Sequence, residues 1–157
     1  MLRSFASVAV FSFLASMAYA DEPAPAGELA QRLASVKFDH YADAPGYSEG
    51  PTWRKGEVYF CCGALLRVDT GKKVTKFLEI GPAGTVLRGD GHLLICDNQN
   101  KAVLDLAPDG KVGVIADRFE TEMLRSLNDL TIDARGNIYW TDPEGSTPEK
   151  PVGHIYR

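Results

Sequence analysis

The feature that most constrains the fold of this chain is a pattern that occurs three times, in which a turn glycine precedes a short strand-forming segment. Gly56, Gly91 and Gly136 stand immediately before residues 57–60, 92–95 and 137–140. The glycines are 35 and 45 residues apart. This spacing is typical of repeats in which each unit forms one sheet of four strands.

The surroundings of each glycine repeat as well. A short apolar segment precedes it, at residues 51–53, 85–87 and 130–132, and another follows it, at residues 65–68, 103–106 and from 155 onward. In the first two units an Asp-containing turn then leads to a fourth segment, residues 74–78 and 112–116. One four-stranded sheet has to stack on neighbours to bury its faces, so the sequence predicts an all-β fold, a β-propeller. A β-sandwich is the alternative, but it does not explain why the same turns recur in the same order.

The third unit stops within its third predicted strand, at Arg157. We therefore expect about two and a half four-stranded blades, whereas closed propellers have at least four. Such an arc leaves apolar sheet faces and open edges, so a truncated propeller with a tendency to self-associate is expected. Two copies that complete each other are one form of this, with residues 36–40 of one chain pairing with the third blade of the other.

The first twenty residues have the pattern of a signal peptide. Arg3 supplies a positive charge, residues 6–17 are apolar, and Ala18-Tyr19-Ala20 places small residues at the cleavage site before Asp21. The apolar run is shorter than the about 20 residues of a membrane-spanning helix. The sequence therefore predicts export to the periplasm or the medium, with no membrane association after cleavage. Residues 21–35 are expected to form a linker with a short helix, and residues 36–157 the partial propeller.

Charge and cysteine content narrow the class of protein further. The net charge is −4 and the basic residues are dispersed, which argues against nucleic acid as a partner.

The three cysteines are Cys61, Cys62 and Cys96. Neighbouring strand residues point to opposite faces, so at most one of the first two can bond to Cys96. Burial of all three as free thiols is the favoured alternative to such a disulfide.

Two positions that precede predicted inner strands carry oxygen ligands. Glu49 lies before the first strand of unit one, and Asn128, followed by Asp129, lies before that of unit three. Starts of inner strands converge on a propeller's central channel, and carboxylate and amide oxygens suit a hard cation such as calcium. Taken separately, a residue such as Glu49 is more often a solvated loop carboxylate, and a pair such as Asn128-Asp129 is more often part of a turn.

Other candidate residues have simpler explanations. His40, His92 and His154 lack a partner at metal or triad spacing, so we expect no catalytic histidine. Asp142 suits either a second ion site or, more simply, the turn before Pro143. The aromatic residues are expected to pack between blades; they are Trp53, Tyr139 and Trp140.

The chain contains the segments EGPTW at residues 49–53, PDG at residues 108–110 and NDLTIDARGNIYWTDP at residues 128–143. Together these segments resemble the gluconolactonase, senescence-marker-protein and luciferin-regenerating-enzyme family. The resemblance implies a six-bladed propeller, a divalent cation, usually calcium, in its channel, and hydrolysis of a lactone. It implies that Glu49 and Asn128 are metal ligands and that Asn128 and Asp129 contact substrate.

This sequence departs from the family pattern in two respects. The family's further asparagine and aspartate ligands come from later blades, beyond Arg157, so this chain encodes an incomplete active site. Leu127 stands where many relatives have proline, which is expected to loosen the turn before Asn128. The alternative functions are therefore a non-catalytic propeller that binds a partner or sugar, and an inactive gene fragment.

Overall fold

The computed structural model describes residues 26–157, so the predicted signal peptide, residues 1–20, lies outside the described part of the chain. Residues from His40 to Arg157 form one compact unit, and those before His40 belong to another. The described part of that other unit contains helix α1 (Ala26–Ser35), which has Glu28 in its first turn and Arg32 in its last, complementing the helix dipole. No helix within residues 26–157 is long and apolar enough to cross a membrane.

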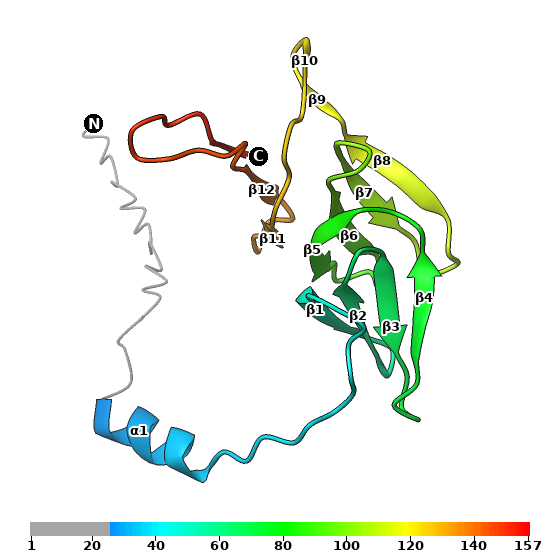
Figure 1. Cartoon of the computed structure of the whole chain (residues 1–157), viewed down its shortest axis with the longest axis vertical. Helices are drawn as coiled ribbons and strands as arrows, with labels where there is room; N and C mark the ends of the chain where they lie inside the picture. Colours follow the sequence, from blue (N-terminus) through cyan, green and yellow to red (C-terminus); the bar gives the residue numbers. More distant parts are fainter. Residues whose placement is uncertain (1–25) are drawn as a thin grey trace, which may run out of the picture. The chain divides into compact units, whose positions relative to one another are not determined.

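The unit from His40 onward contains three antiparallel sheets built on one plan (Figure 1). Blade 1 consists of β1 (Glu49–Arg54), β2 (Glu57–Cys61), β3 (Leu65–Val68) and β4 (Val74–Leu78). Blade 2 consists of β5 (Pro82–Leu87), β6 (Leu93–Asp97), β7 (Ala102–Leu106) and β8 (Val112–Ala116). Blade 3 has three strands, β11 (Leu130–Ile132), β12 (Ile138–Asp142) and β13 (His154–Tyr156). The prediction of an all-β partial propeller is therefore confirmed.

Two features of the strand pattern could not be seen in the sequence. A small hairpin, β9 (Arg118–Phe119) with β10 (Glu122–Met123), occupies the connection between blades 2 and 3. Residues 36–40 form no strand or helix, and Phe38 is 89% exposed. Both segments have few apolar residues that face a core, so the hydrophobic periodicity of the sequence does not indicate their structure.

The three repeating glycines have almost the same backbone conformation. Their φ angles are 89° at Gly56, 86° at Gly91 and 85° at Gly136. Side chains are strongly disfavoured at these positive φ values, whereas glycine adopts them without steric cost. Each glycine thus lets the chain reverse between the first and second strand of its blade, which is why the repeat is visible in the sequence.

Blade 2 lies between two hydrophobic clusters, and its strand β6 is buried along its whole length. Leu93 and Ile95 belong to a cluster shared with Tyr59 and Leu65 of blade 1. Leu94 and Cys96 belong to a second cluster, shared with Trp140 of blade 3. Successive side chains of a strand point to opposite faces, so a strand buried on both sides needs an unbroken apolar run.

The prediction for the aromatic residues is confirmed for Trp140 and wrong for Trp53. Trp140 is 8% exposed and packs against side chains of blade 2. Trp53 is 58% exposed. Alternation along β1 turns Thr52 and Arg54 toward blade 2, where both form hydrogen bonds, and turns Trp53 to the other face. Tyr139 is partly buried and its hydroxyl donates a hydrogen bond to Asp133 of the same blade.

Polar contacts join the inner strands of blades 1 and 2. The Thr85 hydroxyl donates to the Gly50 carbonyl oxygen at 2.7 Å and lies 2.7 Å from the Thr52 hydroxyl. The buried Arg54 guanidinium donates to the Gly91 carbonyl oxygen at 3.0 Å. Buried polar groups have to be paired to avoid a desolvation cost, so these contacts fix how the two blades stack.

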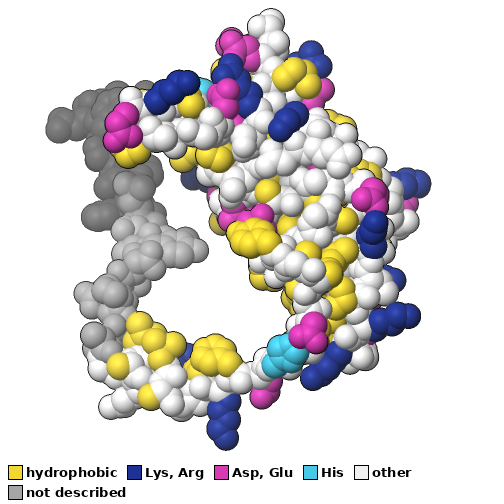
Figure 2. Space-filling view, viewed as in Figure 1, with side chains coloured by type: hydrophobic (Ala, Val, Ile, Leu, Met, Phe, Trp, Pro, Cys, Tyr) yellow, Lys and Arg dark blue, Asp and Glu magenta, His cyan; other side chains and the backbone are white. Residues whose placement is uncertain are grey.

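The face of blade 1 that points away from blade 2 carries a third cluster, Phe60, Ala64, Leu66 and Val68. Ala42, from the segment before β1, packs against it. The four side chains of this cluster are each 8% exposed or less, so the hydrophobic side chains that Figure 2 shows on the surface are mainly other ones.

All three cysteines are free thiols. Cys61 and Cys96 are buried and Cys62 is partly buried. The interpretation as packed free thiols is therefore confirmed for Cys61 and Cys96, while Cys62 retains some access to solvent.

Candidate functional site

The starts of the three inner strands come together with almost no side chain between them. A Cβ atom added to Gly50 of β1 would lie 3.0 Å from the Ala83 carbonyl oxygen of β5. A Cβ added to Gly84 of β5 would lie 2.7 Å from the Asn128 carbonyl oxygen, just before β11. Gly50 and Gly84 therefore bring Glu49, on one side, and Asn128, on the other, to the same end of the three blades.

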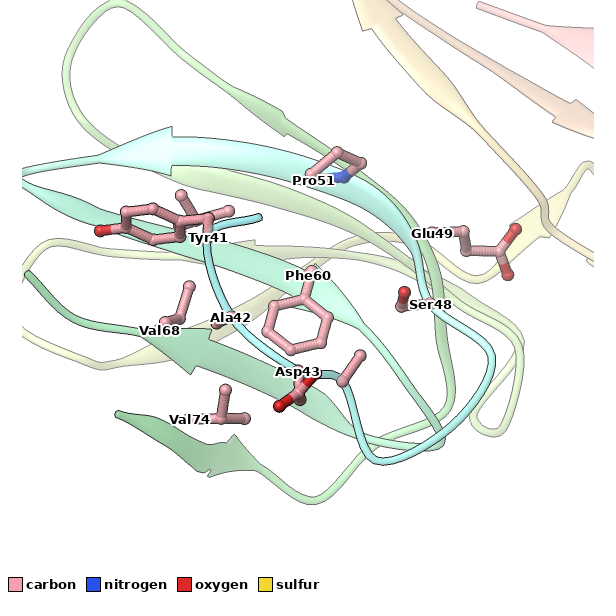
Figure 3. A pocket seen from close by; sticks show the side chains of 11 residues that line it. Tyr41, Ala42, Asp43, Ser48, Glu49, Pro51, Phe60, Val68 and Val74 are labelled. Atoms are coloured by element: carbon pink, nitrogen blue, oxygen red, sulfur yellow. The ribbon is translucent and has the colours of Figure 1, made fainter. Parts of the chain in front are cut away.

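Glu49 is the first residue of β1 and lies opposite Cys61 of β2. Its side chain is partly buried, and its Oε2 atom accepts a hydrogen bond from the Tyr47 hydroxyl at 3.3 Å. Figure 3 shows the carboxylate directed away from the apolar side chains of blade 1, such as Phe60 and Val68. Glu49 thus presents a charged group at the edge of the blade rather than in its core.

Asn128 and Asp129 are exposed, but their backbone is held firmly. The Asn128 N–H donates to the Thr141 carbonyl oxygen at 3.0 Å, and the Asp129 N–H donates to the Thr141 hydroxyl at 3.1 Å. Asp129 Oδ1 accepts the Leu130 N–H at 2.9 Å. The pair is therefore an ordered extension of β11, and its side chains are accessible to a ligand.

The pKa values of the two buried thiols, Cys61 and Cys96, are both raised by their surroundings. Burial raises the pKa of Cys61 to about 12, with further contributions from the charges of Glu49 and Asp129. Burial likewise raises the pKa of Cys96 to about 12, helped by Asp129, Cys61 and Asp142. Coulombic effects fall with distance. Glu49 of blade 1 and Asp129 of blade 3 thus both contribute to the raised pKa of one thiol of blade 1.

Asp142, for which the sequence left two roles open, holds a loop. It ends β12, is 2% exposed, and accepts backbone N–H groups with both oxygens: Arg125 at Oδ2 and Ser126 at Oδ1. It therefore fastens the segment that leads into Asn128. A sign of this role was available in the sequence, because Asp97 and Asp142 each stand six residues after a repeat glycine, but the spacing does not say what either carboxylate binds.

The chemistry of the donors at this end of the blades fits a hard cation. Glu49, Asn128 and Asp129 offer carboxylate and amide oxygens, the ligand types that calcium prefers.

Asn98 of blade 2 offers a further amide oxygen. Its Oδ1 atom is buried without a hydrogen-bond partner within residues 26–157, and its backbone N–H donates to the carbonyl oxygen of Gly81, just before β5. Sequence reasoning missed Asn98, whose burial depends on tertiary packing. No cluster of three His, Cys, Asp or Glu side chains suited to a metal occurs in this part of the chain, so amide oxygens are needed to complete the set.

The histidines lie elsewhere in polar surface contacts. His92 Nδ1 is 2.6 Å from Asp105 Oδ1, in a cluster that includes Arg88. His92 precedes β6, at the opposite end of that strand from Asp97. His40 pairs with Asp43 at 3.1 Å, and His154 stacks on Tyr156.

A pocket of about 210 Å³ lies on the free face of blade 1. Phe60, Val68 and Val74 point into it, and Tyr41 and Ala42 close it from the side (Figure 3). Glu49 lines one end of this pocket, whereas Asn128 and Asp129 do not line it. The pocket is therefore mainly a feature of the apolar sheet face and reaches the candidate site only at Glu49.

Comparison with solved structures shows the same fold in gluconolactonases. A gluconolactonase from Xanthomonas campestris, described as important in glucose secondary metabolic pathways, is 23% identical with a TM-score of 0.64, over 74% of this chain and 45% of that one. A structural-genomics target described as a candidate gluconolactonase is 25% identical with a TM-score of 0.62, over 74% and 43%. Virginiamycin B lyase from Staphylococcus aureus shares only the fold, with 13% identity and a TM-score of 0.51 over 70% and 41%.

This chain spans less than half the length of each of these solved proteins. No curated protein matches the sequence. The model of the SMP-30/gluconolactonase/LRE-like region matches residues 47–157, well over half of the chain and all three blades. The chain therefore belongs to the SMP-30/gluconolactonase/LRE-like family.

Proposed function

We propose that this chain forms part of a calcium-dependent lactone hydrolase, with Glu49 and Asn128 as ligands of the cation and Asn128 and Asp129 as contacts of the substrate. The observation that carries the proposal is the close approach of three backbones, Gly50 with Ala83 and Gly84 with Asn128, which brings Glu49 and the Asn128-Asp129 pair to one end of the three blades. Carboxylate and amide oxygens that converge in this way are the ligand types that calcium prefers.

Each residue has a distinct part in this proposal. Glu49 supplies a full negative charge from a partly buried position, where screening by water is weaker than on the surface. Asn128 supplies a neutral amide oxygen on an ordered backbone. Asp129 Oδ1 is engaged by the Leu130 N–H, which leaves Oδ2 to accept a hydrogen bond from a substrate hydroxyl.

The cation, when bound, would polarise the lactone carbonyl and stabilise the oxyanion that forms when water attacks. The solved gluconolactonases extend over more than twice the length that this chain covers. Complete activity is accordingly proposed for the whole protein, with blades 1 and 3 of this chain contributing the residues named here.

The test is a calcium titration of the whole chain, followed by calorimetry and by thermal unfolding. Binding to the folded state alone raises stability by RT ln(1 + [L]/Kd), about 2.7 kcal/mol at a hundredfold excess over Kd. We expect Glu49→Gln and Asn128→Ala each to reduce this rise, and Glu79→Gln, at an exposed residue of another edge, to leave it unchanged.

Three results would contradict the proposal in different ways. Calcium binding that is unaffected by Glu49→Gln would place the cation elsewhere. A folded wild-type chain with no calcium-dependent rise in melting temperature would favour the non-catalytic binding module. Lactone ring opening by the wild type can be measured as proton release. If it persists fully in the presence of a chelator, the cation takes no part in the reaction.

A further inference from the structure

The loop before Asn128 is fastened by one buried carboxylate at the end of β12. Asp142 Oδ2 accepts the Arg125 N–H at 2.8 Å, and Asp142 Oδ1 accepts the Ser126 N–H at 2.7 Å. Asp142 is 2% exposed. A carboxylate buried to this degree needs donors on both oxygens, and hydrogen bonds to an ionised acceptor are short and strong.

The neighbouring residue extends the same attachment toward the site. Thr141 accepts the Asn128 N–H with its carbonyl oxygen and the Asp129 N–H with its hydroxyl, and its own N–H donates to the Asp129 carbonyl oxygen at 3.0 Å. Leu127, between the two sets of hydrogen bonds, is fully buried in the cluster between blades 2 and 3. Residues 125–129 are thus held as one unit by the last two residues of β12.

Blade 2 has a carboxylate at the matching position that binds different groups. Asp97, six residues after Gly91 as Asp142 is after Gly136, is also fully buried. Its Oδ1 accepts the N–H groups of Gly81 and Gln99 at 3.1 and 3.0 Å. Blade 1 has Cys62 at this position. Of the three residues at this position, Asp142 is therefore the one that holds the segment before Asn128.

We propose that Asp142 is a positioning residue, which fixes the direction of the Asn128 and Asp129 side chains through the backbone of Arg125 and Ser126. This inference rests on the proposed function, because it assigns the support of the same site. Both oxygens of Asp142 are engaged by the loop, so its action is indirect. A residue that orients a metal ligand without touching the metal itself still affects the metal affinity, so its mutation weakens binding.

The test compares Asp142→Asn with Asp97→Asn in the whole chain. The amide introduced by Asp142→Asn has one acceptor oxygen where the carboxylate has two, so one of the two loop N–H groups is left facing an NH₂ donor. Asp97→Asn makes the same exchange at the same position of blade 2 and leaves residues 125–129 untouched. The measurements are hydrogen exchange at the Arg125 and Ser126 amides, the NMR signal of the Asn128 side-chain amide, and calcium affinity by calorimetry.

We expect Asp142→Asn to speed exchange at Arg125 and Ser126, to broaden the Asn128 side-chain signal, and to weaken calcium binding about tenfold or more. Asp97→Asn should lower the melting temperature and leave the exchange at Arg125 and Ser126 and the Asn128 signal near their wild-type values. Unchanged exchange and an unchanged Asn128 signal in Asp142→Asn would overturn the inference. So would equal changes of exchange and of the Asn128 signal in the two variants, because the effect would then be general destabilisation.

The inference and the proposed function fail in distinguishable ways. A wild-type chain that binds no calcium contradicts the proposed function, and the exchange and NMR measurements then decide alone whether Asp142 positions the loop. If the wild-type chain binds calcium, the proposed function is supported. If Asp142→Asn then loosens the loop without changing the calcium affinity, the role of Asp142 in the site is overturned.

Discussion

Gly84 of β5 lies against Asp129, and a Cβ atom added at position 84 would come within 2.6 Å of Asp129 Oδ1. It would also lie 2.7 Å from the Asn128 carbonyl oxygen. Real Cβ atoms do not approach other atoms this closely, so blade 3 can stack on blade 2 in this way only because position 84 has no side chain. One glycine thus connects the packing of two blades with the placement of two candidate site residues.

We predict that Gly84→Ala lowers the free energy of unfolding by about 1–3 kcal/mol, the usual cost of overpacking, and also weakens calcium binding. The added methyl group must displace the backbone of Asn128, which cannot rotate away as a flexible side chain would. Gly113→Ala in β8 is the matched control, since a Cβ there has open space around it. Chemical denaturation and a calcium titration measure the two effects, and equal stability in both variants would contradict the prediction.

The contact between blades 1 and 2 gives a second prediction. Thr85→Val removes the hydroxyl that donates to the Gly50 carbonyl oxygen and contacts Thr52. The isosteric change leaves a partly buried acceptor unpaired, and we expect a loss of about 1–3 kcal/mol in the free energy of unfolding. Thr131→Val, at an exposed position of β11, should change it by less than about 0.5 kcal/mol. Urea denaturation of the two variants decides the matter; similar midpoints would show that the Thr85 hydroxyl does not join the blades.

The thiols provide a chemical test of the folded structure. The pKa of Cys61 and that of Cys96 are both raised to about 12, first by burial, so at pH 8 both remain protonated and unreactive. We expect a disulfide-exchange reagent to modify Cys62 alone in the folded chain and all three cysteines after denaturation. Fewer than three thiols in the denatured, unreduced chain would reveal a disulfide and contradict the assignment of free cysteines.

The ion pair between Arg88 and Asp90, in the turn between β5 and β6, predicts a pH dependence of stability. A hydrogen bond from the Arg88 side chain lowers the pKa of Asp90 to about 2. Its folded-state pKa is thus below the unfolded value, so this group stabilises the fold above about pH 4 and loses that contribution as the pH falls toward 2. Asp90→Asn should therefore lower the melting temperature slightly at pH 6, and the difference from wild type should vanish near pH 2. A difference that is constant over this range would contradict the pKa shift; the effect is small because Asp90 is exposed.

The strand pattern of this protein was largely predictable from its sequence, because it depends on local chemistry. Gly56, Gly91 and Gly136 indicate the first turn of each blade through a backbone conformation that strongly favours glycine. The apolar run that includes Leu94 and Ile95 indicates a strand buried on both faces. The short hairpin after β8 gave no such signal, since its residues are exposed and its strands have two residues each.

The candidate site was predictable only as separate residues. Glu49 and Asn128 could be selected from their places before inner strands, but nothing local to either shows that they share one end of the molecule. That follows from Gly50 and Gly84, whose missing side chains let three backbones touch.

The sequence by itself determined the blades, because turn conformation and strand burial are properties of short segments. Only the tertiary structure decided that Trp53 is exposed, that Asp142 holds the loop before Asn128, and that Asp129 lies against Gly84 of blade 2. The physical reason is that each of these depends on which groups stacking brings together. The sequence pattern within a blade does not encode its contacts with the next.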